Sequence, residues 1–392
     1  MAAPANIFTG LTNDLFVAAD TIAREAVGAI TSVSINTGSE RAAVGQTVKS
    51  GFTRQAVAED WIPSMVEADT TAQTIDMKDL TLTKQKSVPI QWRGEDVKWI
   101  DSGMGFQTAY GDQMIQAMRT LTNLIETDVC AAAALGASRA VGTSGTTPFA
   151  TNYNLINSAG KILIDNGYQS ALTDMRTSAV MDSTAATNLR NLAQLQQVNT
   201  SGGDQLLRQG ILLPLSGIMV KTSSAIQSHT KGTAAGATTN AAGYAIGAVT
   251  ITLASAGTGT IVAGDVITFA GDTNEYVVLT GDTDVSNGGT VVLQAPGLRQ
   301  AIPASATAIT VTNSYTGNVV FHQSAIELAV RAPYMPDGNN DRARWSQMVT
   351  DPHSGLSFDA RLYDGQGTST LRIIAVWGVK VWKPEMVVLL KG

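Results

Sequence analysis

The chain has 392 residues, of which 44% are apolar and only 15% are charged, so its surface is poorer in charge than that of a typical soluble domain. The formal net charge is −6, and no run of Lys and Arg occurs, which argues against nucleic acid as the main partner. The single cysteine, Cys130, excludes an intrachain disulfide. A Thr-, Ser-, Ala- and Gly-rich surface with few charges is suited to burial against neighbouring chains.

The N-terminal sequence lacks the positive start and apolar core of a secretory signal, and no apolar window of 18 residues occurs in the chain. We therefore expect a protein that is made and used in the cytosol, with no membrane partner. Residues 13–30 are predicted to form a first helix, with Asn13 as its cap and one apolar face. This helix is either an arm that docks on a neighbouring subunit or a helix folded back on its own domain.

Residues 40–75 show no strong periodicity, and they predict a long two-stranded excursion because a structureless loop of this length is usually functional or extended. Apolar residues then alternate at 75–82, with a one-residue slip that suggests a bulge, and again at 88–92. These two strands, around a polar turn at 83–87, predict either a β-hairpin or a sheet edge.

The longest periodic segment is residues 106–135, which predicts a helix about 45 Å long at 1.5 Å per residue. Its apolar stripe is Met114, Met118, Leu121, Ile125 and Val129, and Gly136 follows as a natural stop. The polar face is expected to carry Gln113, Gln116, Arg119, Asn123 and Glu126. Such a helix predicts the spine of a large α+β domain.

A Gly-, Ser- and Thr-rich linker at 136–151 leads into a predicted α/β unit, with helices near 153–164 and 189–198 and strands at 179–181 and 218–221. The composition changes at residues 222–316, where short β-branched runs recur about every ten residues. These runs are 249–253, 261–262, 265–269, 276–279, 290–293 and 308–312, and they predict an independent, inserted β-barrel or sandwich. Residues 319–330 predict a strand followed by a helix, and the β-rich runs 371–378 and 387–390 are expected to return to the sheet beside the spine.

No catalytic motif is present, because the sequence contains no HExxH, GxSxG, CxxC or phosphate-loop string, and its three histidines lie far apart. A calcium loop beginning at Asp282 fails, since Asn287 stands where the turn needs glycine and Leu293 where a glutamate should bind the ion. We therefore expect no enzyme activity, no metal and no cofactor. The remaining inventory of arm, excursion, strut helix and inserted barrel is suited to self-assembly.

The order of these elements resembles the HK97-fold major capsid proteins of tailed phages. Three segments are similar to the coat protein of phage P22 and its relatives: 264–271, 318–330, and the 372–388 ending with Trp377-Gly378-Val379 and Lys383-Pro384-Glu385. The resemblance implies an α+β fold with a long spine helix, an extended E-loop, an N-terminal arm and an inserted β-barrel domain. It covers nearly the whole chain.

The resemblance also implies a domain division. The N-terminal arm would be 1–43, the E-loop 44–75, the P-domain 76–152 with 371–392, the A-domain 153–221 with 317–370, and the inserted domain 222–316. Candidate subunit-interface residues follow from these positions: Arg54, Glu59, Asp60 and Trp61 in the E-loop, and Asp272, Glu275, Asp282 and Asp284 in loops of the inserted barrel. The last four are equally well interpreted as ordinary polar turns.

By the same resemblance, the chain would assemble with a scaffolding protein into an icosahedral procapsid of hexamers and pentamers, with a portal protein at one vertex. Double-stranded DNA would be packaged as non-specific cargo, the protein would reside in the virion capsid, and assembly would take place in the host cytoplasm. An alternative is a phage tail-tube or decoration protein, which would form rings or bind a pre-existing surface. A third class, an enzyme, would require a deep pocket with clustered carboxylates of perturbed pKa.

Overall fold

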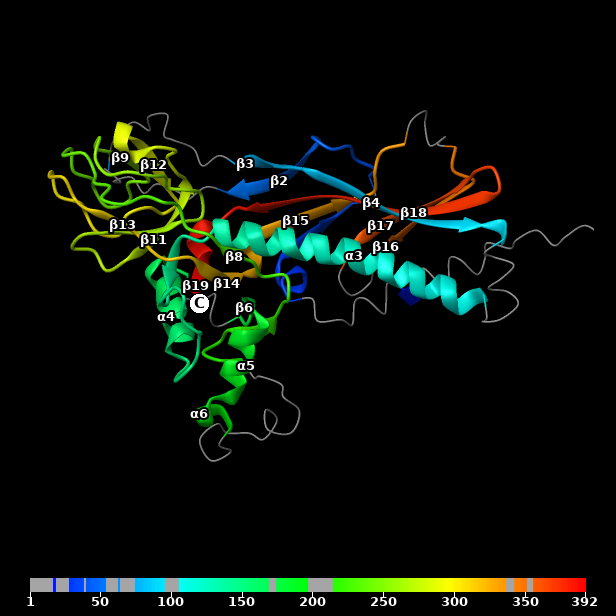
Figure 1. The fold of residues 1–392 in the computed structure, drawn as a ribbon, viewed down its shortest axis with the longest axis horizontal. Helices are drawn as coiled ribbons and strands as arrows, with labels where there is room; N and C mark the ends of the chain where they lie inside the picture. The colour runs from blue at the N-terminus through cyan, green and yellow to red at the C-terminus, as the bar shows by residue number, and fades with distance from the viewer. Residues whose placement is uncertain are drawn as a thin grey trace, which may run out of the picture.

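The computed structural model describes residues 17–18, 28–38, 40–53, 63, 75–95, 106–168, 174–196, 214–335, 342–350 and 355–392. The fold is α+β, with few helices and many strands. One helix runs along the long axis of an elongated molecule; a β-rich lobe lies at one end, and a smaller helical lobe projects to the side (Figure 1).

The described helices are α3 (Phe106–Leu135), α4 (Asn154–Asp165), α5 (Ser183–Asn191) and α6 (Ala193–Gln196), with short 3-10 turns at η1 (Ile30–Ser32), η3 (Val285–Asn287), η4 (Gln323–Ala325) and η5 (Pro384–Met386). The first strands are β1 (Ser34–Thr37), β2 (Thr47–Thr53), β3 (Ile75–Thr81), β4 (Lys84–Arg93), β5 (Arg139–Val141), β6 (Thr177–Met181), β7 (Met219–Thr222) and β8 (Ser228–His229). They are followed by β9 (Thr250–Leu253), β10 (Val266–Phe269), β11 (Glu275–Thr280), β12 (Gly289–Leu293), β13 (Ile309–Val311), β14 (Tyr315–His322), β15 (Ile326–Arg331), β16 (Trp345–Thr350), β17 (Ser357–Asp364), β18 (Thr368–Val381) and β19 (Val387–Lys391).

The spine helix has the predicted bounds, and every residue of its predicted apolar stripe is buried. The stripe packs on one face of a six-stranded sheet, in which β18 pairs with β15 and β17 on one side and with β4 on the other. Asp128 ties the two layers together, since its carboxylate accepts from Trp377 Nε1 at 2.7 Å and binds Lys84 Nζ at 2.6 Å. The prediction for Glu126 is wrong: it is only 4% exposed and does not belong to the polar face.

A second, larger sheet has the order β13-β10-β11-β5-β19-β14-β6-β7 and joins the lateral lobe to the inserted strands. Helices α4 and α5 pack on it around buried residues of β6, β14 and β19. The inserted strands enclose a core of their own, with Phe269, Tyr276 and Leu293 among its members. They are nevertheless not an independent sheet, because β11 pairs with β5. Of the six runs predicted there, five contain strands, and Ile261 forms only an isolated bridge to Asp282.

Several local predictions are wrong for identifiable reasons. Strands β3 and β4 do not form a hairpin; β3 pairs with β2, and β4 is the edge of the six-stranded sheet, which was the other alternative. The ladder between β2 and β3 is continuous, so no bulge interrupts residues 75–81. Residues 326–331 form a strand, β15, and not a helix. Both faces of β15 are buried, and a short apolar run of this kind cannot be told from a helix by periodicity.

Two strand regions are not predicted by the sequence, and most of the predicted first helix lies outside the described residues. The 136–151 linker contains a short strand, β5, that sits between β19 and β11. The polar stretch before 371 forms the antiparallel pair β16–β17. Of the predicted first helix, only residues 17–18 are described as helical, and residues 30–32 form the 3-10 turn η1.

Candidate assembly surfaces

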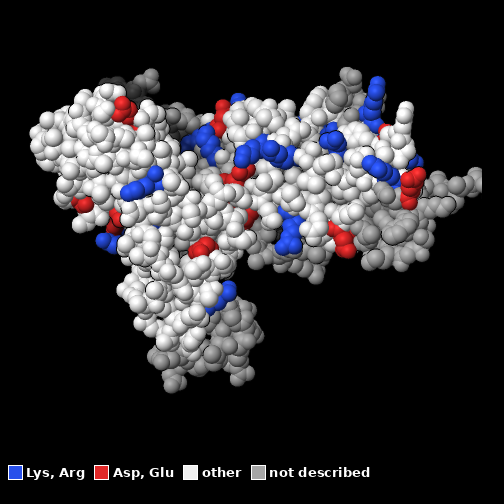
Figure 2. All heavy atoms as spheres, in the orientation of Figure 1, with Lys and Arg blue, Asp and Glu red and all other residues white. Residues whose placement is uncertain are grey.

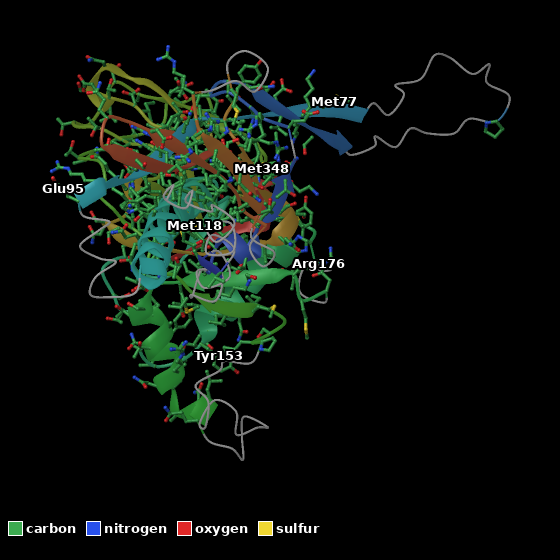
Figure 3. All side chains as sticks on the ribbon, turned by 90° about the vertical axis from the view of Figure 1, so that its right-hand side faces the viewer. Met77, Glu95, Met118, Tyr153, Arg176 and Met348 are labelled. Carbon is green, nitrogen blue, oxygen red and sulfur yellow. The ribbon has the colours of Figure 1, made fainter. Side chains whose placement is uncertain are left out.

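Strands β2 and β3 form a two-stranded ribbon that stands off the body, with Met77 on it (Figure 3). The register runs without interruption from the pair Thr47–Thr81 to the pair Thr53–Ile75. No third strand pairs with either one in the described part of the chain. The side chain of Met77 is 70% exposed, although methionine is normally a buried residue. The ribbon therefore offers unpaired strand edges and apolar surface to another chain.

The root of the ribbon is fixed to the body through one carboxylate. Glu327 of β15, which is almost fully buried, accepts from Trp382 Nε1 at 2.6 Å, from Ser50 Oγ at 2.9 Å and from Asn36 Nδ2 at 2.8 Å. Leu80 and Leu82 add a small apolar cluster below it. Buried polar groups cost free energy unless they are hydrogen-bonded, and Trp382 and Asn36 satisfy the carboxylate from the body while Ser50 of β2 ties the ribbon to it.

The indole ring of Trp382 lies beside Glu327. Two ammonium groups lie near the Trp382 ring, Lys380 Nζ at 4.7 Å and Lys78 Nζ at 5.4 Å from its centroid, distances at which cation–π attraction operates. Lys380 also donates to the backbone carbonyl of Asp79 in β3 at 3.0 Å. The base of the ribbon is thus held by cation–π contacts to one tryptophan and by a hydrogen bond from β18 to β3.

The six-stranded sheet has a hollow of about 700 Å³ on the face opposite α3, lined by Gln85, Lys86, Ser87, Tyr363, Thr370, Arg372 and Ile374. Arg372 of β18 stands directly opposite Arg361 of β17 in the ladder. Asp359 binds Arg361 at 2.7 Å and is shared with Arg41 at 2.9 Å, whereas Arg372 is exposed and no carboxylate is among the described residues that line the hollow. Like charges directly opposite each other are unfavourable in a sheet, so this face favours an anionic neighbour.

Charged side chains are sparse on the face shown in Figure 2, and Lys and Arg gather mainly along the edge above α3, near the ribbon and β4. Most of the visible described surface is uncharged, as the composition predicts. Water is removed at less cost from uncharged side chains than from ionised ones, so this surface is suited to contact with other chains.

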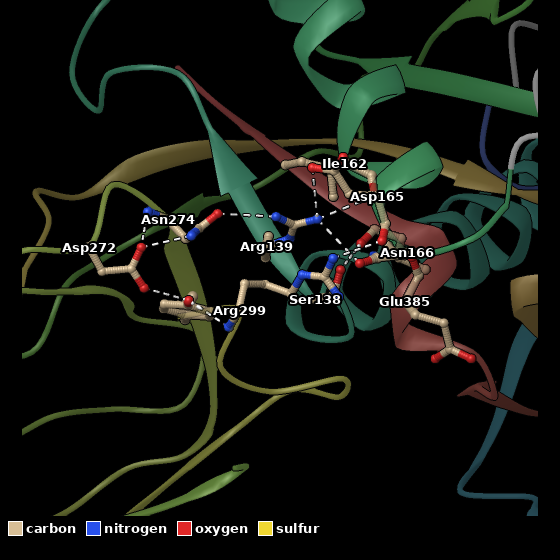
Figure 4. A network of polar contacts seen from close by, with 11 residues as sticks. Ser138, Arg139, Ile162, Asp165, Asn166, Asp272, Asn274, Arg299 and Glu385 are labelled. Carbon is tan, nitrogen blue, oxygen red and sulfur yellow. Dashed lines mark hydrogen bonds and ion pairs between the residues drawn. The ribbon is translucent and has the colours of Figure 1, made fainter. Parts of the chain in front are cut away.

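A buried arginine joins the inserted strands to the rest of the molecule (Figure 4). Arg139 of β5 donates to Asn274 Oδ1 at 3.1 Å on the inserted side, and to Ile162 O at 3.3 Å and Asn166 Oδ1 at 3.2 Å at the end of α4. Burial lowers the pKa of Arg139, with Arg299 adding to the effect and Asp165 opposing it. Arg299 itself donates to Asp165 O at 2.9 Å. These hydrogen bonds connect the inserted strands to the end of α4, and residue spacing in the sequence did not predict them.

The structure describes four of the eight predicted interface residues, and all four have partners within the chain. Asp272 accepts from Tyr276 Oη at 2.6 Å, and Glu275 binds Lys391 Nζ at 2.8 Å. Asp282 accepts from the amide of Asp284, and Asp284 caps η3 through Ser286. The other four predicted residues, Arg54, Glu59, Asp60 and Trp61, lie outside the described residues.

Reactive groups are held in structural roles. His229 binds Asp265 at 2.9 Å, and His322 binds Asp174 at 3.1 Å, while His353 lies outside the described residues. Burial, reinforced by Glu126, raises the pKa of the Cys130 thiol to about 12, so the sulfur stays protonated and is a poor nucleophile at neutral pH. No group of three or more possible metal ligands occurs among the described residues. Nor does any described helix have the length and apolar character needed to cross a membrane.

No protein-family model matches the sequence. No curated protein matches it either. Solved structures similar to this chain are phage capsids and related particles. The mature capsid of bacteriophage PhiM1 is 10% identical, with coverage of 92% of this chain and 85% of that one and a TM-score of 0.46. The capsid of a native GTA particle is 11% identical, with 94% and 90% coverage and a TM-score of 0.46. A virus-like particle from Pyrococcus furiosus is 7% identical, with 96% and 98% coverage and a TM-score of 0.40.

Proposed function

We propose that this chain is a major capsid protein with the HK97 fold, which assembles into the icosahedral head of a tailed bacteriophage and encloses packaged double-stranded DNA. The observation that carries the proposal is the β2–β3 ribbon, which stands off the body and has no third strand among the described residues. Isolated two-stranded ribbons are marginal in water, and exposed strand edges invite pairing, so such a ribbon is completed by a neighbouring chain.

The position of the ribbon supports a head-to-tail contact. The ribbon stands off the body (Figure 3), whereas β4 is an edge strand of the six-stranded sheet that pairs only with β18 among the described strands, so the two exposed edges belong to different parts of the chain. A contact between two different surfaces of identical chains is heterologous, and it closes into rings when the rotation fits. Hexamers and pentamers of this chain are the rings that a shell requires.

In this proposal the N-terminal arm is 1–43 and the E-loop is 44–75. The P-domain combines 76–152, which includes α3, with 371–392. The A-domain combines 153–221 with 317–370, and 222–316 is the inserted domain, as in P22-like coat proteins. Arg54, Glu59, Asp60 and Trp61 would contact a neighbour within a capsomer. Asp272, Glu275, Asp282 and Asp284 would contact a neighbouring capsomer. A scaffolding protein and a portal protein are further partners, and assembly takes place in the host cytoplasm before the chain becomes part of the virion.

The role is structural and not enzymatic. The described histidines and Cys130 are engaged in internal contacts, and the hollow on the sheet is lined by cations and neutral groups without a carboxylate pair. General acid–base catalysis needs titratable groups that converge on a substrate, which this arrangement does not provide.

Removing the segment that connects the two strands of the ribbon tests the proposal. Replacing residues 54–74 with Asn-Gly would join the opposed residues Thr53 and Ile75 by a two-residue hairpin turn that suits the observed ladder. We expect this variant to remain folded by circular dichroism but to form no shells in sedimentation velocity experiments. Assembly equal to that of the natural chain would contradict the proposal. Rings alone, from the natural chain as well, would favour a tail-tube or decoration protein.

A further inference from the structure

The spine helix holds a buried carboxylate that its sequence pattern assigns to the solvent. Glu126 Oε1 accepts from the backbone amide of Ala29 at 2.7 Å, and Oε2 accepts from that of Ile30 at 2.8 Å. These amides open the 3-10 turn η1, where backbone N–H groups have no partner within the turn. Both carboxylate oxygens are therefore used to hold one short segment against α3.

A cation holds the other end of the same segment. Lys221 Nζ donates to Thr31 O at 3.2 Å and to Thr31 Oγ1 at 3.1 Å. The carboxylate thus holds the two amides at the start of the turn, and the ammonium group holds the carbonyl and hydroxyl of its middle residue. Burial lowers the pKa of Lys221, and the Glu126 charge opposes this effect, so the two side chains feel each other's charge.

The fit between the segment and the body is close. A Cβ atom added to Gly28 would lie 2.7 Å from the carbonyl oxygen of Thr222, nearer than nonbonded carbon and oxygen atoms approach in proteins. Ser32 Oγ closes the segment on itself by donating to Gly28 O at 2.7 Å. The site is therefore matched to a glycine followed by a tight turn.

We propose that Glu126 of α3 and Lys221 of β7 form a latch that fixes residues 28–32 to the body. Local opening would free the amides of Ala29 and Ile30 from Glu126, and Thr31 from Lys221. It would also expose the buried side chains of Ala29 and Ile30, which belong to the main apolar core, so we expect a local and transient opening of this segment. The inference concerns the monomer and does not rest on the proposed function.

Hydrogen exchange of the full chain, read by mass spectrometry, tests the latch. Glu126→Gln keeps the side-chain shape but turns one acceptor into a donor that faces a backbone N–H. We expect exchange at residues 28–32 to become on the order of 10- to 100-fold faster, while β15 and β18 keep their protection. Asp112→Asn, on the exposed surface of the same helix, is the matched control and should change neither region.

Gly28→Ala tests the opened latch independently. Its added Cβ would clash with the carbonyl oxygen of Thr222 and push the segment away from the body without changing a charge. It should reproduce the local loss of protection, whereas Gly94→Ala, where an added Cβ meets open space, should not. Unchanged protection at 28–32 in both test variants would overturn the inference. So would faster exchange that affects β15 and β18 equally, since Glu126 would then support the fold as a whole.

Discussion

At the scale of single residues, Arg139 shows how one buried side chain links two parts of the chain. Its three hydrogen bonds join Asn274 in the inserted strands to the end of α4. We expect Arg139→Met to lower the free energy of unfolding by about 3 kcal/mol, at about 1 kcal/mol for each hydrogen bond. Urea denaturation measures this, with the exposed Arg93→Met as control. A loss no larger than that of the control would show that the joint contributes little.

The buried thiol and phenols predict instability at high pH. Burial raises the pKa of Cys130 from 9.0 to about 12, and burial together with Asp272 raises that of Tyr276 from 10.0 to about 12. Above pH 9 the unfolded chain loses these protons while the folded chain keeps them, so the unfolded state binds fewer protons and stability falls as pH rises. Thermal unfolding between pH 8 and pH 11 should show this decline, and Cys130→Ala should make it shallower. A stability that stays level across this range in the natural chain would contradict the prediction.

Arg372 carries a prediction about assembly. Its cross-strand neighbour Arg361 shares Asp359 with Arg41, while Arg372 lines the hollow, where no carboxylate is found among the described residues. We expect Arg372→Glu to impair assembly in sedimentation experiments, since it would repel an anionic neighbour, and to leave the monomer folded or slightly more stable. Arg372→Gln should have a smaller effect. Normal assembly of the glutamate variant would mean that no anion docks on this face.

At the scale of elements, the main apolar core lies between the apolar stripe of the spine helix and the six-stranded sheet. Leu121→Ala should cost about 2–5 kcal/mol of unfolding free energy, because a large buried side chain is removed from a packed interior. Leu124, on the exposed side of the same helix, is the control, and its replacement by alanine should cost far less. Equal losses in the two variants would mean that the stripe is not what holds the helix.

Sequence patterns predicted this helix well because thirty residues of one period exceed any competing signal. They predicted most inserted strands because turn residues separate β-branched runs, and they predicted an excursion at 40–75 from its lack of periodicity, but they did not predict that β3 pairs with β2. They failed at β15, where burial on both faces removes the alternation that marks a strand. Glu126 was placed wrongly because helical position predicts a face, whereas its partners, Ala29 and Ile30, are nearly a hundred residues away.

The candidate surfaces were predictable only in outline. The lack of periodicity at 40–75 predicted an extended excursion. Its anchor was not predictable, because Glu327, Trp382 and Ser50 come from three distant segments of the sequence. Arg139 lay in a stretch that composition described as a linker, and its role comes from the crossing of β5 between β19 and β11. Such contacts arise from topology, which local spacing does not encode.

At the scale of the whole molecule, the elongated shape, the projecting ribbon and the weakly charged surface fit a protein that is completed by copies of itself (Figures 1 and 2). The chain uses its described carboxylates largely for internal anchors, such as Glu126, Glu327 and Asp359, and leaves strand edges and uncharged side chains for contact. Repeated copies would then cover the ribbon, the β4 edge and the hollow around Arg372.

Electron microscopy of the purified chain, alone and together with the proposed scaffolding protein, tests the central claim most directly. The capsid proposal predicts closed shells tens of nanometres across, built of hexamers and pentamers in which the β2–β3 ribbon of each copy contacts a neighbour. Monomers or small rings under both conditions would contradict it, and would place the chain among tail or decoration proteins instead.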